Sequence, residues 1–210
     1  MFNFLKKNKN RISKEEEFWN YFLKNKKSLE EFINSDLSDY TSFNKLTDNI
    51  RKYSSLLFSE ITQNEKGKFV LIITPDGNPD GIPDATKLFE SKPEIENWVV
   101  EKFRQPKDSL QFEYDGLKYP SSDIEILLEV DNEREKVNLQ VFIRNMDLDK
   151  EKYQTMAWLY LDNILGEYNS ITKIGYIDFY NLENEKKVKD GISILELRES
   201  MDKEIYKAEK

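Results

Sequence analysis

The sequence contains no cysteine and no histidine. Without these residue types the chain cannot build a Ser-His-Asp or Cys-His nucleophile pair, thiol redox chemistry, or a zinc site with the usual nitrogen and sulfur ligands. Any catalysis would rest on carboxylates, lysine, tyrosine, serine or threonine, with magnesium or calcium held by oxygen ligands. The absence of cysteine also means that the fold does not depend on an oxidising compartment.

Arginine is scarce, and basic residues are outnumbered by acidic ones. The chain has 32 basic and 40 acidic residues, a formal net charge of −8 and a sequence pI near 4.9. The six arginines are scattered, whereas phosphate recognition favours clustered arginine. We therefore expect neither a nucleic acid nor an anionic membrane surface as partner.

The sequence also lacks a long apolar run. Met1 to Leu5 is followed at once by Lys6 and Lys7, which is not the pattern of a secretory signal peptide. No later segment approaches the length of a membrane-spanning helix. We expect a cytoplasmic protein with a flexible tail at residues 1–12 and one domain at residues 13–210, in an oligomeric state that the sequence leaves open.

Hydrophobic periodicity predicts the secondary structure. Ser13 and Glu16 form a capping-box pattern at the start of the first expected helix. Helices are expected at 14–33, 40–53, 85–89, 153–165 and 194–206, and strands at 56–61, 69–73, 98–103, 112–114, 124–130, 137–143 and 171–180. Two strand pairs are typical of hairpins. The sequence therefore predicts an α+β fold with a mainly antiparallel sheet of about five to seven strands and helices packed on one face.

The segment from Thr74 to Asp84 combines acidic and amide side chains with glycine and proline. Its oxygen donors match the first, third, fifth and ninth ligand positions of an EF-hand calcium loop: Asp76, Asn78, Asp80 and Asp84. The twelfth position, where a bidentate carboxylate belongs, is Lys87. An ordinary strand-to-helix turn explains the same residues, and we expect no metal there, with calcium as the alternative.

A second candidate site combines Arg104, Trp158, Asp162 and Glu167. Asp162 lies one helical turn from Trp158 and off the apolar stripe of its predicted helix. Glu167 follows the predicted end of that helix, where negative charge is unfavourable unless a cation compensates it. The alternatives are a binding site and a structural ion pair with Arg104 or Lys173.

The segments Trp98 to Arg104 and Leu161 to Tyr168 carry a family resemblance. In order and content, the chain from Phe18 through the last predicted strand resembles a family of uncharacterised bacterial cytoplasmic proteins. Some members of that family look like the front half of a longer chain with a second domain of unknown function. The resemblance implies no catalytic or binding residue.

Acidity without catalytic residues favours a binding role. The leading hypothesis is a non-enzymatic protein-interaction module that binds a basic protein partner, in the manner of an immunity protein or antitoxin. The alternative is a carboxylate- or metal-dependent enzyme that uses the loop from Asp76 to Asp84. A housekeeping domain of unassigned role is the third possibility.

Overall fold

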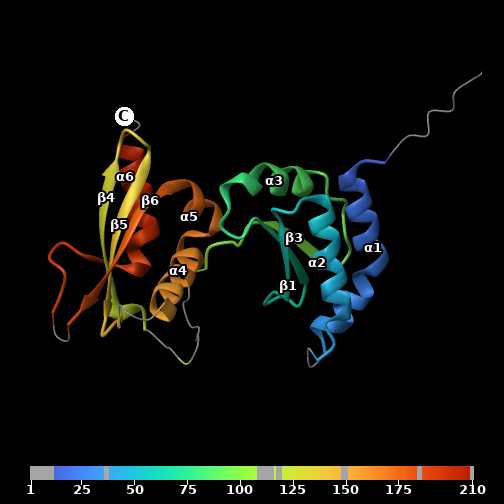
Figure 1. The fold of residues 1–210 in the computed structure, drawn as a ribbon, viewed down its shortest axis with the longest axis horizontal. Helices are drawn as coiled ribbons and strands as arrows, with labels where there is room; N and C mark the ends of the chain where they lie inside the picture. Colours follow the sequence, from blue (N-terminus) through green and yellow to red (C-terminus); the bar gives the residue numbers. More distant parts are fainter. Residues whose placement is uncertain are drawn as a thin grey trace, which may run out of the picture. The chain divides into compact units, whose positions relative to one another are not determined.

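The computed structural model describes residues 12–35, 38–107, 116, 120–147, 151–183 and 186–208. The predicted tail lies outside these residues except for Ile12, and the extended piece predicted at 112–114 lies outside them entirely. By contacts between residues, the chain divides into two compact units (Figure 1). Unit 1 comprises Met1–Pro75 and Asp80–Lys102, and unit 2 comprises Asp76–Pro79 and Phe103–Lys210.

Each unit contains its own mixed sheet. The α+β class predicted from the sequence is confirmed. The single, mainly antiparallel sheet predicted for residues 13–210 is wrong, because the described strands form one three-stranded and one four-stranded sheet. Both sheets combine antiparallel hairpins with a parallel pair that is joined through helices.

Unit 1 combines helices with a three-stranded sheet. Its elements are α1 (Lys14–Ile33), α2 (Thr41–Tyr53), β1 (Phe58–Gln63), β2 (Phe69–Thr74), α3 (Ile82–Glu90) and β3 (Trp98–Lys102), with a 3-10 turn at Pro79–Gly81 before α3. The strand order is β1-β2-β3. The predicted hairpin of β1 and β2 is confirmed, whereas β3 runs parallel to β2 after the α3 crossover.

The first helix begins as the sequence predicts. The Ser13 hydroxyl accepts a hydrogen bond from the Glu16 backbone N–H at 3.1 Å, and the Glu16 carboxylate accepts one from the Ser13 backbone N–H at 2.9 Å. Further along α1, the Trp19 indole N–H donates to the Leu88 carbonyl at 3.1 Å, and the Phe22 ring lies edge-to-face on Trp98 at 5.0 Å. These contacts join α1 to α3 and β3 in the core of unit 1.

Unit 2 covers a second sheet with helices. Its elements are a 3-10 turn (Ser121–Asp123), β4 (Ile124–Asp131), β5 (Lys136–Arg144), α4 (Glu151–Leu165), α5 (Glu167–Lys173), β6 (Ile174–Leu182), β7 (Ile192–Ser193), a 3-10 turn (Ile194–Glu196) and α6 (Leu197–Ala208). The strand order is β6-β5-β4-β7. The predicted hairpin of β4 and β5 is confirmed, and β6 runs parallel to β5 after the crossover through α4 and α5.

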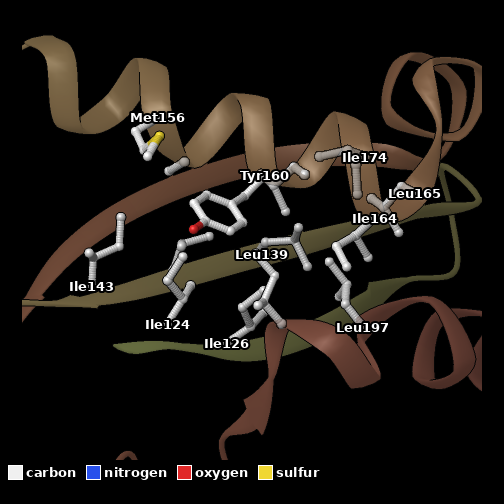
Figure 2. Packing of buried hydrophobic residues seen from close by; sticks show 14 of the residues in the cluster. Ile124, Ile126, Leu139, Ile143, Met156, Tyr160, Ile164, Leu165, Ile174 and Leu197 are labelled. Carbon is white, nitrogen blue, oxygen red and sulfur yellow. The ribbon is translucent and has the colours of Figure 1, made fainter. Parts of the chain in front are cut away.

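Alternation along β5 gives this sheet one buried and one open face. Leu139 and Val141 are buried, while Gln140 between them is exposed. Figure 2 shows the α4 side chains of Tyr160 and Ile164 packed against the strands, with Leu197 of α6 in the same cluster. Helices α4 and α6 therefore cover the buried face, and polar and aromatic side chains occupy the open one.

Candidate functional site

Arg104 lies at the centre of a cluster of acidic side chains in unit 2. Its guanidinium Nη2 is 2.5 Å from Asp76 Oδ1, and its Nη1 is 3.4 Å from Asp162 Oδ2 and 3.8 Å from Glu167 Oε1. The structure thus brings together three of the residues singled out from the sequence, Arg104, Asp162 and Glu167. It adds Asp76, which sequence reasoning had placed in the calcium-like loop.

Glu167 is the fully buried member of this cluster, with 0% of its side chain exposed. Its Oε1 accepts a hydrogen bond from the Gly77 backbone N–H at 3.1 Å, and its Oε2 accepts one from the Arg104 backbone N–H at 3.2 Å. As predicted, Glu167 follows the end of α4 at Leu165, but it is also the first residue of α5, where negative charge is favourable. The Gly77 and Arg104 backbone N–H groups and the Arg104 guanidinium therefore compensate the charge of the Glu167 carboxylate.

The backbone around this cluster has positive φ at several residues, including Asp76 and Gly77. Gly166, between α4 and α5, has φ 76°, and a Cβ there would lie 2.8 Å from Pro106 Cδ. Phe103 has φ 66°, which is unusual for a bulky residue, and its ring stacks on Tyr168 at 5.4 Å. Nothing in the sequence signals the Phe103 conformation, yet the Arg104 N–H that bonds Glu167 follows it directly.

Asp162 has a perturbed ionisation. Burial raises the pKa of this carboxyl group, and the negative charges of Glu167 and Asp76 act in the same direction, whereas the neighbouring Ser170 hydroxyl and the Arg104 guanidinium oppose them. About a quarter of the side chain, 26%, remains exposed. The cluster as a whole sets one guanidinium against three carboxylates, so it carries a net charge of −2 when all of them are ionised.

A pocket of about 290 Å³ opens beside the cluster. Its lining combines the charged groups with backbone and apolar side chains: Asp76, Gly77, Pro79, Arg104, Trp158, Asp162, Ser170 and Ile171. Trp158 is 46% exposed, and its ring lies edge-to-face on Phe179 of β6 at 6.2 Å. The pocket therefore presents an accessible aromatic ring next to an excess of negative charge. Three of the four residues singled out from the sequence line it, Arg104, Trp158 and Asp162, and the fourth, Glu167, is buried.

The residues of the calcium-like loop from Asp76 to Asp84 are divided between the two units. Asp76 and Asn78 belong to unit 2, and Asp80 and Asp84 belong to unit 1. Asp76 is paired with Arg104, while Asp84 lies in the first turn of α3. Within the described residues, no group of three or more acidic side chains is arranged to hold a metal ion. The expectation that this loop holds no metal, and the alternative that it binds calcium, both stay predictions from the sequence.

Lys87, the residue at the twelfth position of that loop, has a partner in unit 1. Its ammonium group lies 2.7 Å from Glu15 Oε1 in the first turn of α1. The hydrogen bond from Lys87 is the main reason why the pKa of Glu15 is lowered to about 2. Burial, together with the nearby charge of Glu15, raises the pKa of Tyr53. The ion pair of Glu15 and Lys87 joins α1 to α3, and neither residue lines the candidate pocket.

Among the described helices, none is both long and apolar enough to cross a membrane. The cytoplasmic location stays a prediction from the sequence. Comparison with known proteins yields no relative, since no protein-family model, no curated protein and no solved structure matches the chain. The resemblance to a family of bacterial proteins is therefore also still a prediction, and function must be argued from the site itself.

Proposed function

We propose that the protein is a non-enzymatic interaction module that binds a basic protein partner through the pocket beside Arg104. A role like that of an immunity protein or antitoxin, in which an acidic protein neutralises a basic one, fits this proposal. The observation that carries it is the exposed Trp158 ring beside a cluster with two more negative than positive charges. The partner would insert a lysine or arginine side chain into the pocket.

The charge balance of the pocket supports a cationic ligand. In the contacts described for the cluster, one guanidinium, that of Arg104, engages three carboxylates, those of Asp76, Asp162 and Glu167. A second cation near Asp162 would stabilise the ionised form of a carboxyl group whose pKa is raised by burial. An anionic ligand would be repelled, because the three carboxylates surround the guanidinium of Arg104.

Trp158 supports a protein ligand. Tryptophan and arginine are the residues most enriched among the energetic hot spots of protein interfaces, and a cation above an indole ring gains further attraction. Trp158 packs against Phe179 on one side and exposes nearly half of its surface, so its ring is both supported and accessible. Such a ring can contact the aliphatic stem of a lysine or arginine while the charged end reaches Asp162.

The enzyme alternative has less support in the geometry. That alternative requires a carboxylate of the Asp76 to Asp84 loop to act as a general base or metal ligand. The Asp76 carboxylate is bound through Oδ1 by the Arg104 guanidinium at 2.5 Å, so that oxygen is already engaged by a cation. Asp84 lies in the first turn of α3 in the other unit. These positions favour binding over catalysis.

Affinity capture with matched variants tests the proposal. The wild-type chain, Asp162→Asn and the control Asp202→Asn, an exposed acid on α6 of the same unit, are immobilised and exposed to lysate of the source organism. We expect one basic protein to be retained in stoichiometric amount by the wild type and by Asp202→Asn, and to be depleted with Asp162→Asn. Retention that does not differ among the three would refute binding through this pocket.

A further inference from the structure

The edge strand β6 is much longer than β7, the strand at the opposite edge of the same sheet. In the order β6-β5-β4-β7, β6 pairs only with β5 among the described strands and spans nine residues, whereas β7 spans two. Edge strands present unpaired backbone N–H and C=O groups, which proteins usually protect by shortness, lysine, proline or bulges. β6 contains no lysine, arginine or proline, and its register irregularity lies only near its start, opposite Val137 and Leu139.

Three exposed side chains alternate along β6 on the open face of the sheet. Tyr176, Asp178 and Tyr180 are exposed, while Ile177 and Phe179 between them pack against the core. Tyr176 is 63% exposed, and the Tyr180 ring stacks on Phe142 of β5 at 4.9 Å. Asp178 is the only charged residue of the strand, so β6 carries a single negative charge between two tyrosine rings.

A hollow beside these side chains is also lined by acidic residues. It has a volume of about 400 Å³ and is lined by Leu127, Leu128, Glu129, Asn138, Leu139, Gln140, Tyr176 and Asp178. Among the described residues of this lining, Glu129 and Asp178 are acidic and none is basic. The Arg134 guanidinium already donates to the Tyr176 hydroxyl at 3.2 Å and lies 5.8 Å from the centre of its ring, so the preference of this surface for cationic side chains comes from Glu129 and Asp178.

The edge of β6 is also continuous with the pocket beside Arg104. Trp158, on the rim of that pocket, contacts Phe179 of β6. Ile171, which lines the pocket, precedes the first residue of β6 by three positions. A chain that runs along β6 would thus meet Trp158 on one face of the sheet and the Tyr176, Asp178, Tyr180 row on the other.

We propose that the basic partner docks an extended segment of its chain on the edge of β6 as an additional strand. This inference rests on the proposed function and adds how the partner is recognised. Backbone hydrogen bonds to β6 would supply affinity, and a lysine or arginine of the added strand would face Asp178 between the two tyrosine rings. The next side chains along that strand, on the opposite face, would contact Trp158 and Phe179.

The net charge of the chain favours a basic segment of the partner over a second copy of the chain as the strand that pairs with β6. Pairing β6 of one copy with β6 of another would bring together two chains that each carry a net charge of −8. A basic segment instead compensates Asp178 and the acidic hollow at the same time. Self-association through β6 is consequently the competing outcome of the experiment.

Hydrogen exchange and titration of the full-length chain with a defined peptide test strand addition. The probe is a capped peptide of about nine residues in which lysine alternates with β-branched threonine. Its control has the same sequence with alternate backbone nitrogens methylated, which removes hydrogen-bond donors but keeps the charge. We expect the unmethylated peptide to protect amides of β6 from exchange and to bind at least about tenfold more tightly than the control.

Substitutions separate the strand contact from the pocket. Asp178→Asn is expected to weaken peptide binding several-fold and Asp178→Lys, which adds a typical edge-protecting residue, to abolish it, with Asp202→Asn unchanged. Equal binding of both peptides, or no protection in β6, would overturn strand addition. Concentration-dependent protection of β6 without peptide would overturn it in favour of self-association. If the captured partner still loses affinity with Asp162→Asn but not with Asp178→Lys, strand addition fails while the proposed function stands.

Discussion

Glu167 carries its carboxylate where no part of its side chain reaches solvent. A buried charge is tolerated only when hydrogen bonds and an opposite charge compensate it, and here two backbone N–H groups and the Arg104 guanidinium do so. Both N–H groups belong to segments that lack regular structure at that point, Gly77 and Arg104. Glu167 therefore fixes the backbone that positions the pocket.

Replacing Glu167 tests this structural role. We expect Glu167→Gln to lower the free energy of unfolding of unit 2 by about 2 kcal/mol, because charged hydrogen bonds are replaced by neutral ones at a buried position. Exchange of the slowest amides of β4 and β5 measures the loss. The control Asp76→Asn removes a half-exposed partner of Arg104 and should cost less than about 1 kcal/mol. Equal costs for the two variants would contradict the assignment.

Asp162 gives binding a pH dependence. Its pKa is raised in the free protein, chiefly by burial, and a bound cation would lower it because the ionised carboxylate is then compensated. Binding therefore releases protons, and we expect affinity for the partner to fall as the pH decreases toward and through the raised pKa. Calorimetric titrations across this range measure the effect. Asp162→Asn should bind more weakly and lose this component of the pH dependence, whereas a profile unchanged by the substitution would exclude Asp162 from the interface.

At the scale of elements, α1 and α3 are joined by the pair of Glu15 and Lys87. The folded-state pKa of Glu15, about 2, lies below its ordinary value of 4.5, so the pair stabilises the fold above pH 4.5. That stability is lost as the pH falls from 4.5 through about 2. Glu15→Gln should therefore be less stable than the wild type at neutral pH and equal to it at the acidic end.

Fluorescence can follow this change in unit 1 alone. The chain has three tryptophans, of which Trp19 and Trp98 lie in unit 1 and Trp158 in unit 2. In a Trp158→Phe background, urea unfolding monitored by tryptophan emission reports on the surroundings of α1 and β3. A destabilisation by Glu15→Gln that stays constant across the acidic range would show that the Lys87 pair is not its cause.

The elements that sequence reasoning predicted are those fixed by local signals. The capping box of Ser13 and Glu16 marks the start of α1, the helical spacing of apolar residues marks α4, and short turns define both hairpins. The parallel pairs β2 with β3 and β5 with β6 were missed, because their partners are separated by helices and no local pattern specifies which strands meet. α5 was missed as a separate helix because Gly166 resembles a helix end.

The candidate site was predictable in composition but not in geometry. Arg104, Trp158, Asp162 and Glu167 attracted notice as charged or aromatic residues at unusual positions, and the structure brings all of them around one pocket and its buried support. Asp76 was assigned to a different site, because its pairing with Arg104 depends on how the loop after β2 packs in unit 2. The positive φ of Phe103 arises from that packing and has no sequence signal.

At the scale of the whole molecule, the net charge of −8 adds to the local argument. A surplus of negative charge attracts a basic partner from a distance and accelerates encounter, and salt screens this attraction over a length of about 8 Å at physiological ionic strength. We expect the association rate for the captured partner to fall at least about tenfold between low and high salt, with a smaller change in the dissociation rate. Stopped-flow measurements at several salt concentrations determine both rates. A salt-independent association rate would contradict electrostatic recognition.

The affinity of the captured basic partner for Trp158→Ala tests the central claim most directly. Titration calorimetry compares this variant with the wild type and with Asp202→Asn. If Trp158 anchors a basic side chain beside the Arg104 cluster, Trp158→Ala should bind about 30-fold more weakly, a loss of about 2 kcal/mol, with Asp202→Asn unchanged. A folded Trp158→Ala variant that binds as tightly as the wild type would contradict the account, because the partner would then be recognised elsewhere.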